Sequence, residues 1–124
     1  MPTPPRPTDS ELEILTVLWS TGPATVREVH AVISRRRAAE YATVLKFLQI
    51  MAEKGLVQRN EKQRAHVYEA ARPREWTQKQ LAGDLLERAF NGSAKALLMG
   101  TLSARKASAE ELAEMRKMLD EYGK

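Results

Sequence analysis

The sequence contains no cysteine, only two histidines and no long apolar run, and each shortage excludes a class of protein. Without cysteine, no disulfide framework and no cysteine-ligated zinc, copper or iron–sulfur site can form. Neither histidine has partners at the spacing of a metal site, so we expect no metal and no cofactor. The apolar stretches are far shorter than the ~20 residues that cross a bilayer, which excludes membrane insertion. The N-terminal segment lacks the apolar core of a secretion signal, which predicts a cytoplasmic location.

The charge is nearly balanced over the whole chain but unevenly placed along it. The 124 residues include 20 basic and 16 acidic side chains, for a net charge of +4. Residues 27–64 carry nine basic and four acidic side chains, whereas residues 76–124 carry eight and seven. An excess of positive charge in one segment favours an anionic partner for that segment. On charge alone, a solvated basic face remains an equal alternative.

The first half of the chain predicts three helices and a β-hairpin. Ser10 with Glu13, and Thr25 with Glu28, have the spacing of a capping box at a helix start. Gly55 follows the third apolar stripe at the place where a helix commonly ends. The pattern then changes to alternation, which indicates strands. The predicted helices cover residues 10–21, 25–34 and 40–54, and the predicted strands cover 56–60 and 66–70.

The second half predicts three more helices, beginning near Thr77, Ser93 and Ser108. These helices carry many large apolar residues in a segment of only about fifty residues. A segment this small buries little of its surface on its own. We therefore expect a homodimer; packing of these helices on the chain's own first half is the alternative. The predicted dimerisation residues are Leu85, Phe90, Leu97, Leu98, Leu112, Met115, Leu119 and Tyr122.

This order of elements predicts a mainly α fold with a small β-hairpin: a winged helix-turn-helix domain followed by a helical dimerisation domain. In the winged form of this motif, the third helix enters the DNA major groove and the ribbon lies against the backbone. We expect a flexible Pro-rich arm (residues 1–8), a DNA-binding domain (9–73) and a dimerisation domain (74–124). The candidate DNA-binding residues are Ala42, Thr43, Lys46 and Gln49 on the third helix, Arg35, Arg36 and Arg37 before it, and Lys62 and Arg64 in the hairpin.

A winged-helix module that binds a protein rather than DNA would fit the same pattern, since fold does not determine function. The charge of residues 27–64 favours DNA. An enzyme is not expected, because the sequence has no Gly-rich phosphate loop, no metal-ligand cluster and no nucleophile–base pair.

The histidines and tryptophans are given structural roles. We expect His30 to face solvent. We expect His66, in the hairpin, to pack within its strand, and a contact with the DNA backbone is the alternative. Trp19 and Trp76 are predicted to anchor the cores of the first and second halves, respectively.

Four segments resemble the penicillinase-repressor family (BlaI/MecI type), over residues 9–122. The segments are Ser10–Trp19, Thr25–Val29, Thr43–Val57 and Ser108–Leu112. The resemblance implies a dimeric repressor of double-stranded operator DNA with inverted-repeat sequence. In members that have one, a membrane-embedded metalloprotease sensor triggers cleavage of the repressor and loss of DNA binding.

The chain also departs from that family's pattern. Its better-studied members carry an arginine near the positions of Leu45 and Ile50, so their base preference is not transferred here. The bond cut in those members is Asn–Phe, and its counterpart here lies near Gly100-Thr101. The copper-responsive branch uses a Cys-rich C-terminal motif, which this chain lacks.

Overall fold

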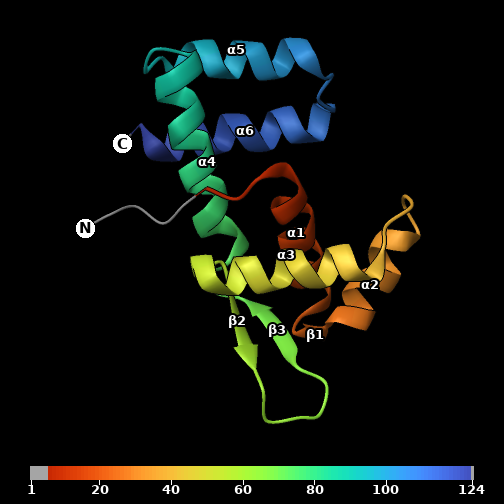
Figure 1. Ribbon diagram of the computed structural model, residues 1–124. Coiled ribbons are helices and arrows are strands. Elements are labelled where there is room, and N and C mark those ends of the chain that lie inside the picture. The colour runs from red at the N-terminus through yellow and green to blue at the C-terminus, as the bar shows by residue number, and fades with distance from the viewer. Residues whose placement is uncertain (1–5, 124) are drawn as a thin grey trace. The chain divides into compact units, whose positions relative to one another are not determined.

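The computed structural model describes residues 6–123 and contains helices with one small sheet (Figure 1). The chain divides between residues 81 and 82 into two compact units. The architecture confirms the expected fold class, a winged helix followed by a helical part. In chain order the elements are α1 (Asp9–Thr21), β1 (Ala24–Thr25), α2 (Val26–Ser34), α3 (Tyr41–Lys54), β2 (Val57–Asn60), β3 (Val67–Ala70), α4 (Arg74–Ala89), α5 (Ala94–Ala104) and α6 (Ala109–Tyr122).

Helix α1 begins with a capping box between Thr8 and Glu11, so the prediction of Ser10 with Glu13 is wrong by two residues. The Glu11 amide donates to Thr8 Oγ1 (3.3 Å), and the Thr8 amide donates to Glu11 Oε1 (2.9 Å). The same carboxylate accepts from Lys54 Nζ at 2.9 Å, on the last residue of α3. The observed cap therefore includes a residue, Glu11, that also makes a long-range contact with Lys54. The spacing of residues within α1 does not show this contact.

The boundaries of α2 and α3 follow the sequence closely. Thr25 and Glu28 form the predicted capping box: the Thr25 amide donates to Glu28 Oε1 (2.9 Å), and the Glu28 amide donates to Thr25 Oγ1 (3.2 Å). Helix α3 ends at Gly55, whose φ of 83° and ψ of 14° lie in the left-handed region that favours glycine. The predicted third helix is therefore confirmed.

The sheet has three antiparallel strands in the order β1-β3-β2. Val57 pairs with Ala70 and Asn60 with Val67, which confirms the predicted hairpin. The strand β1 is additional, and its Ala24 pairs with Tyr68. Two residues are too few to show the alternation that identifies a strand, so the sequence pattern missed it.

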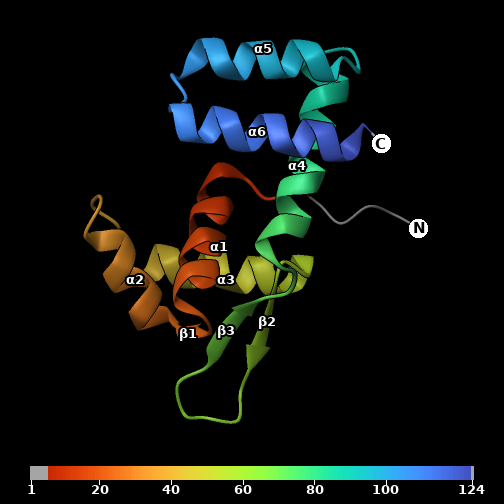
Figure 2. The same cartoon turned by 180° about the vertical axis from the view of Figure 1, so that it is seen from behind.

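The first unit has a continuous apolar core built from α1, α2, α3 and the sheet. Tyr68 on β3 is 1% exposed, and from α3 the side chains of Val44, Leu48 and Met51 are buried against it. This core holds α3 along one face only. The opposite face of α3 is therefore left to solvent: α3 lies in front of α1 in Figure 1, whereas Figure 2, seen from behind, shows α1 in front of α3.

Helix α4 begins at Arg74, three residues before the predicted start, so Thr77 lies inside the helix and does not cap it. Its beginning belongs to the first unit: Trp19 Nε1 donates to the Arg72 carbonyl (2.9 Å), and the Arg72 guanidinium lies 4.7 Å from the centroid of the Trp76 ring. The expectation that Trp76 anchors a second core is wrong. Trp19, which is partly buried, does pack against the first core as expected.

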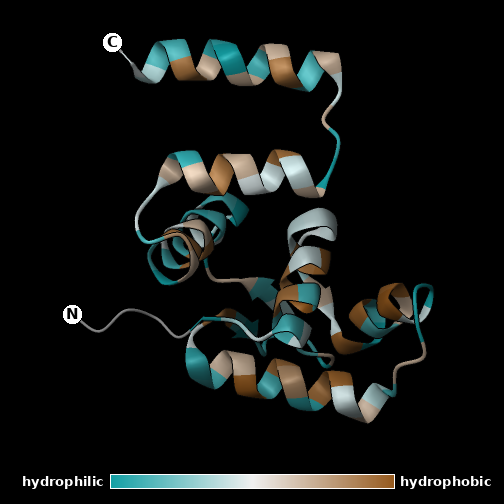
Figure 3. Cartoon of the chain, turned by 90° about the horizontal axis from the view of Figure 1, so that it is seen from above, coloured by the Kyte–Doolittle hydropathy of each residue, from teal (hydrophilic) through white to brown (hydrophobic). Residues whose placement is uncertain are grey.

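The second unit contains the end of α4 with α5 and α6, and none of its residues between 82 and 123 is buried. Helices α5 and α6 run in opposite directions, and hydrophobic residues recur along both (Figure 3). Among the predicted dimerisation residues, Leu119 is 60% and Tyr122 86% exposed. Leu85 is also exposed, and the others are partly buried: Phe90, Leu97, Leu98, Leu112 and Met115.

Candidate nucleic-acid interface

The outward face of α3 presents four exposed side chains that the sequence singled out: Ala42, Thr43, Lys46 and Gln49. They share one face because the residues between them, Val44 and Leu48 among others, are buried. Within residues 6–123, Lys46 forms no ion pair. A surface depression of about 500 Å³ lies along this face, lined by Ala42, Thr43, Lys46, Phe47 and Ile50.

The start of α3 is held by His30, which is not the solvent-facing residue we expected. Its Nε2 lies 2.8 Å from the Ala39 carbonyl and 3.1 Å from Ser34 Oγ, and its ring packs edge-on against Tyr41 at 5.8 Å between centroids. His30 follows the buried Val29, so it lies at the edge of the packed face of α2. The ring thereby fixes the turn that positions α3.

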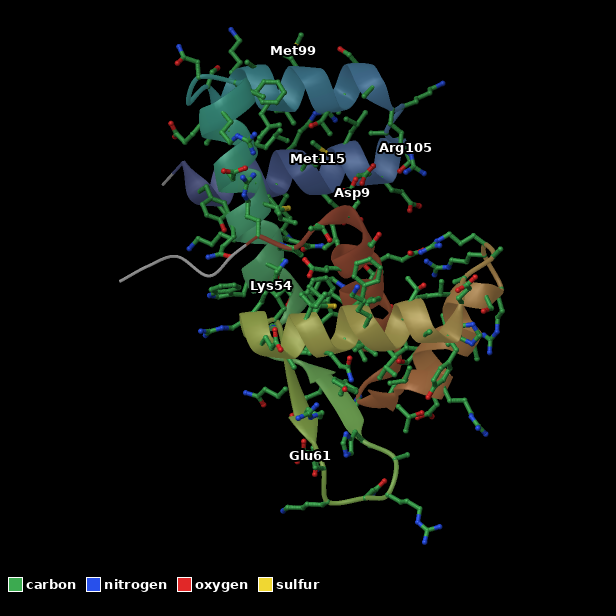
Figure 4. The ribbon with its side chains drawn as sticks, in the orientation of Figure 1. Asp9, Lys54, Glu61, Met99, Arg105 and Met115 are labelled. Atoms are coloured by element: carbon green, nitrogen blue, oxygen red, sulfur yellow. The ribbon has the colours of Figure 1, made fainter. Side chains whose placement is uncertain are left out.

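The hairpin β2–β3 and its loop form the wing, residues 57–70. Lys62 and Arg64 in the loop are exposed, and neither forms an ion pair within the described residues. Arg59 differs: its guanidinium lies 2.5 Å from the Glu61 carboxylate. Glu61 marks the wing in Figure 4. A hydrogen bond with Tyr68 and the charge of Glu61 raise the pKa of Arg59 above its usual value. The wing thus presents the unpaired side chains of Lys62 and Arg64, whereas the charge of Arg59 is neutralised by Glu61.

A second depression, of about 530 Å³, lies between the wing, the start of α2 and α3. It brings Arg27 of α2 together with Arg64 and His66 of the wing, beside Tyr41. His66 is exposed, so the expectation that it packs within its strand is wrong. The sequence reasoning also missed Arg27 and Tyr41 as surface contacts. Arg27 stands two residues after the Thr25 cap, a position that places a side chain at a helix start, and this signal was available.

The three arginines after α2 are all exposed but not equivalent. The Arg37 guanidinium binds the Glu13 carboxylate of α1 at 2.6 Å, and this hydrogen bond lowers the pKa of Glu13. With Arg36, it lines a groove along α1. Arg35 forms no ion pair in the described part of the chain. Of the three arginines, Arg37 is thus the one whose charge is already paired with a carboxylate of α1, so it is the least available to bind another molecule.

Leu45 and Ile50, near which the better-studied members of the resembled family carry arginine, line two different depressions. Leu45 is partly buried against the core and lines the depression beside the wing. Ile50 lines the depression on the outward face of α3. The surface beside Lys46 is therefore more apolar than arginine would make it.

The sequence model of the penicillinase repressor family matches residues 7–121. The chain belongs to the penicillinase repressor family. It is 36% identical over 115 residues to "Transcriptional regulator BlaI" of Mycobacterium tuberculosis, in each of two strains, covering 91% of this chain and 82% of that protein. It is 24% identical over 118 residues to "Penicillinase repressor" of Bacillus licheniformis, covering 95% and 92%. Family members are transcriptional repressors and not enzymes.

Residues 6–123 contain no cluster of three or more histidine, aspartate or glutamate side chains that could hold a metal ion. No helix in the described part of this family member is long and apolar enough to cross a membrane.

Proposed function

We propose that this chain represses transcription by binding double-stranded operator DNA as a homodimer, with α3 in the major groove and the wing on the backbone. The observation that carries the proposal is the outward face of α3. It combines short polar side chains with an unpaired Lys46, and the unpaired Lys62 and Arg64 of the wing lie beyond it. Family membership supports the repressor role.

The chemistry of this face suits base reading. Ala42 and Thr43 are short and let the helix backbone approach the base edges. The Gln49 amide can bond adenine bidentately, and the Lys46 ammonium can reach the O6 and N7 atoms of guanine. Lys62, Arg64 and Arg35 would bind phosphates, which positions the helix without specifying sequence.

The second unit supports the homodimer. No described residue of this helical unit is fully buried, and several of its large apolar side chains are exposed and available to a partner. Against a twofold copy, Leu119, Tyr122 and Met99 would be covered. Two linked heads then match an inverted repeat, and the second contact becomes intramolecular.

Fluorescence anisotropy on DNA from the gene's own promoter tests the DNA-binding part. We expect Lys46→Ala to weaken specific binding about tenfold, equivalent to a loss of ~1–2 kcal/mol. Arg64→Ala should weaken all sequences and lower the salt slope by about one. Lys95→Ala, on the exposed face of α5, is the matched control. If the Lys46/Arg64 double variant bound as well as the wild type, a winged-helix module for a protein partner would become the better assignment.

For release, the proposal is a proteolytic signal from a membrane metalloprotease sensor. The counterpart of the family's cut bond lies near Gly100-Thr101, within α5, where Thr101 Oγ1 donates to the Leu97 carbonyl (2.8 Å). A protease needs extended backbone, so α5 would have to open first. Mass spectrometry of the repressor from induced cells tests this route. A full-length chain after loss of DNA binding would refute it.

A further inference from the structure

We propose that a cavity between α1, the end of α3 and the start of α4 binds a small carboxylate with an apolar or aromatic body, and that its occupancy alters DNA affinity. The claim that the cavity binds a carboxylate is independent of the proposed function, whereas the claim that its occupancy alters DNA affinity rests on the proposed function. The cavity has a volume of about 290 Å³ and lies entirely within the first unit. Its lining residues are Leu15, Lys54, Gly55, Leu56, Arg72, Trp76 and Thr77.

The first indication of a ligand is Thr77. It is 6% exposed and is the one buried residue of α4. Its hydroxyl has no hydrogen-bond partner within residues 6–123. In that part of the chain, every completely buried side-chain oxygen or nitrogen does have a hydrogen-bond partner. The Thr77 hydroxyl is therefore not completely buried, and Thr77 is one of the residues that line the cavity. A nearly buried donor with no protein partner favours a polar group in the space beside it.

The second indication is an uncompensated positive charge. Lys54 donates to both Glu11 oxygens (3.0 and 2.9 Å) and is thereby neutralised. Arg72 forms no ion pair with any described carboxylate, and its guanidinium lies over the Trp76 ring. A cation stacked on an aromatic ring keeps its outer N–H groups for an incoming anion, and a carboxylate is the planar partner that fits a guanidinium fork.

The remaining lining is apolar and limits the size of the ligand. Leu15, Leu56 and the Trp76 ring provide apolar contacts, and the volume is at the lower end of the range for small-molecule sites. A carboxylate on a single ring or short branched chain meets these conditions. A phosphate lacks the apolar body that these walls would contact.

The place of the cavity links it to DNA binding. Lys54 is the last residue of α3, and Gly55 and Leu56 connect it to β2; the helix and the wing are the parts proposed to contact DNA. Figure 4 shows Lys54 at the end of α3, beside the first turns of α4. A ligand that contacts both sides of this connection can favour one arrangement of helix and wing, provided that it binds the two arrangements unequally.

The binding test uses benzoate as the probe and benzamide as its uncharged control, followed by two-dimensional NMR of the full-length protein. We expect benzoate to shift the Gly55 amide and the Trp76 indole N–H with a Kd on the order of 1 mM, which suits so small a fragment. Gly22, which follows α1 and does not line the cavity, should not shift. Benzamide should bind much more weakly.

Two variants and a control make this test specific. Arg72→Gln should weaken benzoate binding by about tenfold, whereas Arg74→Gln, which removes a charge outside the cavity, should not. Thr77→Val should weaken binding without lowering the melting temperature, because the lost hydroxyl has no partner in the fold. Absence of benzoate shifts, or equal binding by the Arg72→Gln and Arg74→Gln variants, would overturn the site.

The DNA test repeats the promoter anisotropy with benzoate, with benzamide and with sodium chloride at matched ionic strength. A change of at least about threefold in Kd with benzoate alone, lost in Arg72→Gln, supports the coupling. Benzoate binding with unchanged DNA affinity would overturn the coupling. Failure of the ligand-free protein to bind DNA would instead refute the proposed function, and the NMR test distinguishes the two because it contains no DNA.

Discussion

The ion pair between Glu11 and Lys54 allows a sharp stability prediction. The Glu11 side chain is 2% exposed and Lys54 is 32% exposed, and their charged atoms lie 2.9 Å apart. Lys54→Met keeps the apolar stem and removes the ammonium. The Glu11 carboxylate then stays buried with its Thr8 cap as its remaining hydrogen-bond partner.

The expected cost follows from this asymmetry of burial. Removing one partner of a fully buried pair costs about 3–5 kcal/mol, because the other charge is left without compensation. Because water reaches the partly exposed Lys54, the expected cost here is about 2–3 kcal/mol. The pair of Arg37 with Glu13 is the matched control, since Arg37 is 51% exposed. Arg37→Met should lower the free energy of unfolding much less than Lys54→Met does, because water screens an exposed ion pair.

Chemical denaturation followed by tryptophan fluorescence measures both variants, because Trp19 and Trp76 lie in the first unit. The midpoint should fall for Lys54→Met at constant m-value. Burial raises the pKa of Glu11, but the Thr8 hydrogen bond and the Lys54 ammonium outweigh it, so the net shift is downward. The contribution of the pair is therefore present above the unfolded pKa and is lost as pH falls through the folded pKa. Equal losses for the two variants, or a Lys54→Met penalty that persists in acid, would refute the reasoning.

Three further predictions concern caps, glycines and assembly. Thr25→Ala should cost about 1 kcal/mol in denaturation, because it removes half of the α2 capping box; a change below about 0.3 kcal/mol would contradict this. Gly55→Ala should destabilise the fold by about 1 kcal/mol, because φ is 83° there. Gly83→Ala should instead stabilise by up to about 1 kcal/mol, because Gly83 lies within α4 and has open space around its Cβ position. Stability changes of the same sign for both variants would count against the backbone argument. Leu119→Lys should yield a monomer in size-exclusion chromatography with light scattering; an unchanged dimer would exclude Leu119 from the interface, and a monomeric wild type would refute the homodimer.

The fold was predictable where local chemistry determines it. The Thr25–Glu28 box, the stop at Gly55 and the apolar stripe of α3 depend on residues within one turn of each other, and each was placed correctly. The error at the start of α1, in contrast, accompanies a long-range contact. Glu11 forms the α1 cap and also binds Lys54, which lies 43 residues away.

In the candidate site, too, some features follow from the local sequence and others depend on contacts between distant residues. The outward face of α3 follows from its helical period, so Lys46 and Gln49 could be identified as exposed from the sequence. Whether a cation is already neutralised depends on which distant acid reaches it. Arg35 and Arg37 have equivalent sequence contexts, yet only Arg37 faces Glu13 on α1. Arg27 and His66 come from separate elements, so their meeting beside the wing required the fold.

The contrast between the two units bears on how the proposed repressor would respond to its own concentration. The first unit has a closed core, so its DNA-binding surface can persist in a single chain. The second unit has no buried residue between 82 and 123, and its stability would come from a partner copy. Dilution would then loosen α5 and α6 before it affects α3. Hydrogen exchange should therefore depend on protein concentration in α5 and α6 but not in α3. Equal dependence in both units would show that the first unit also needs its partner.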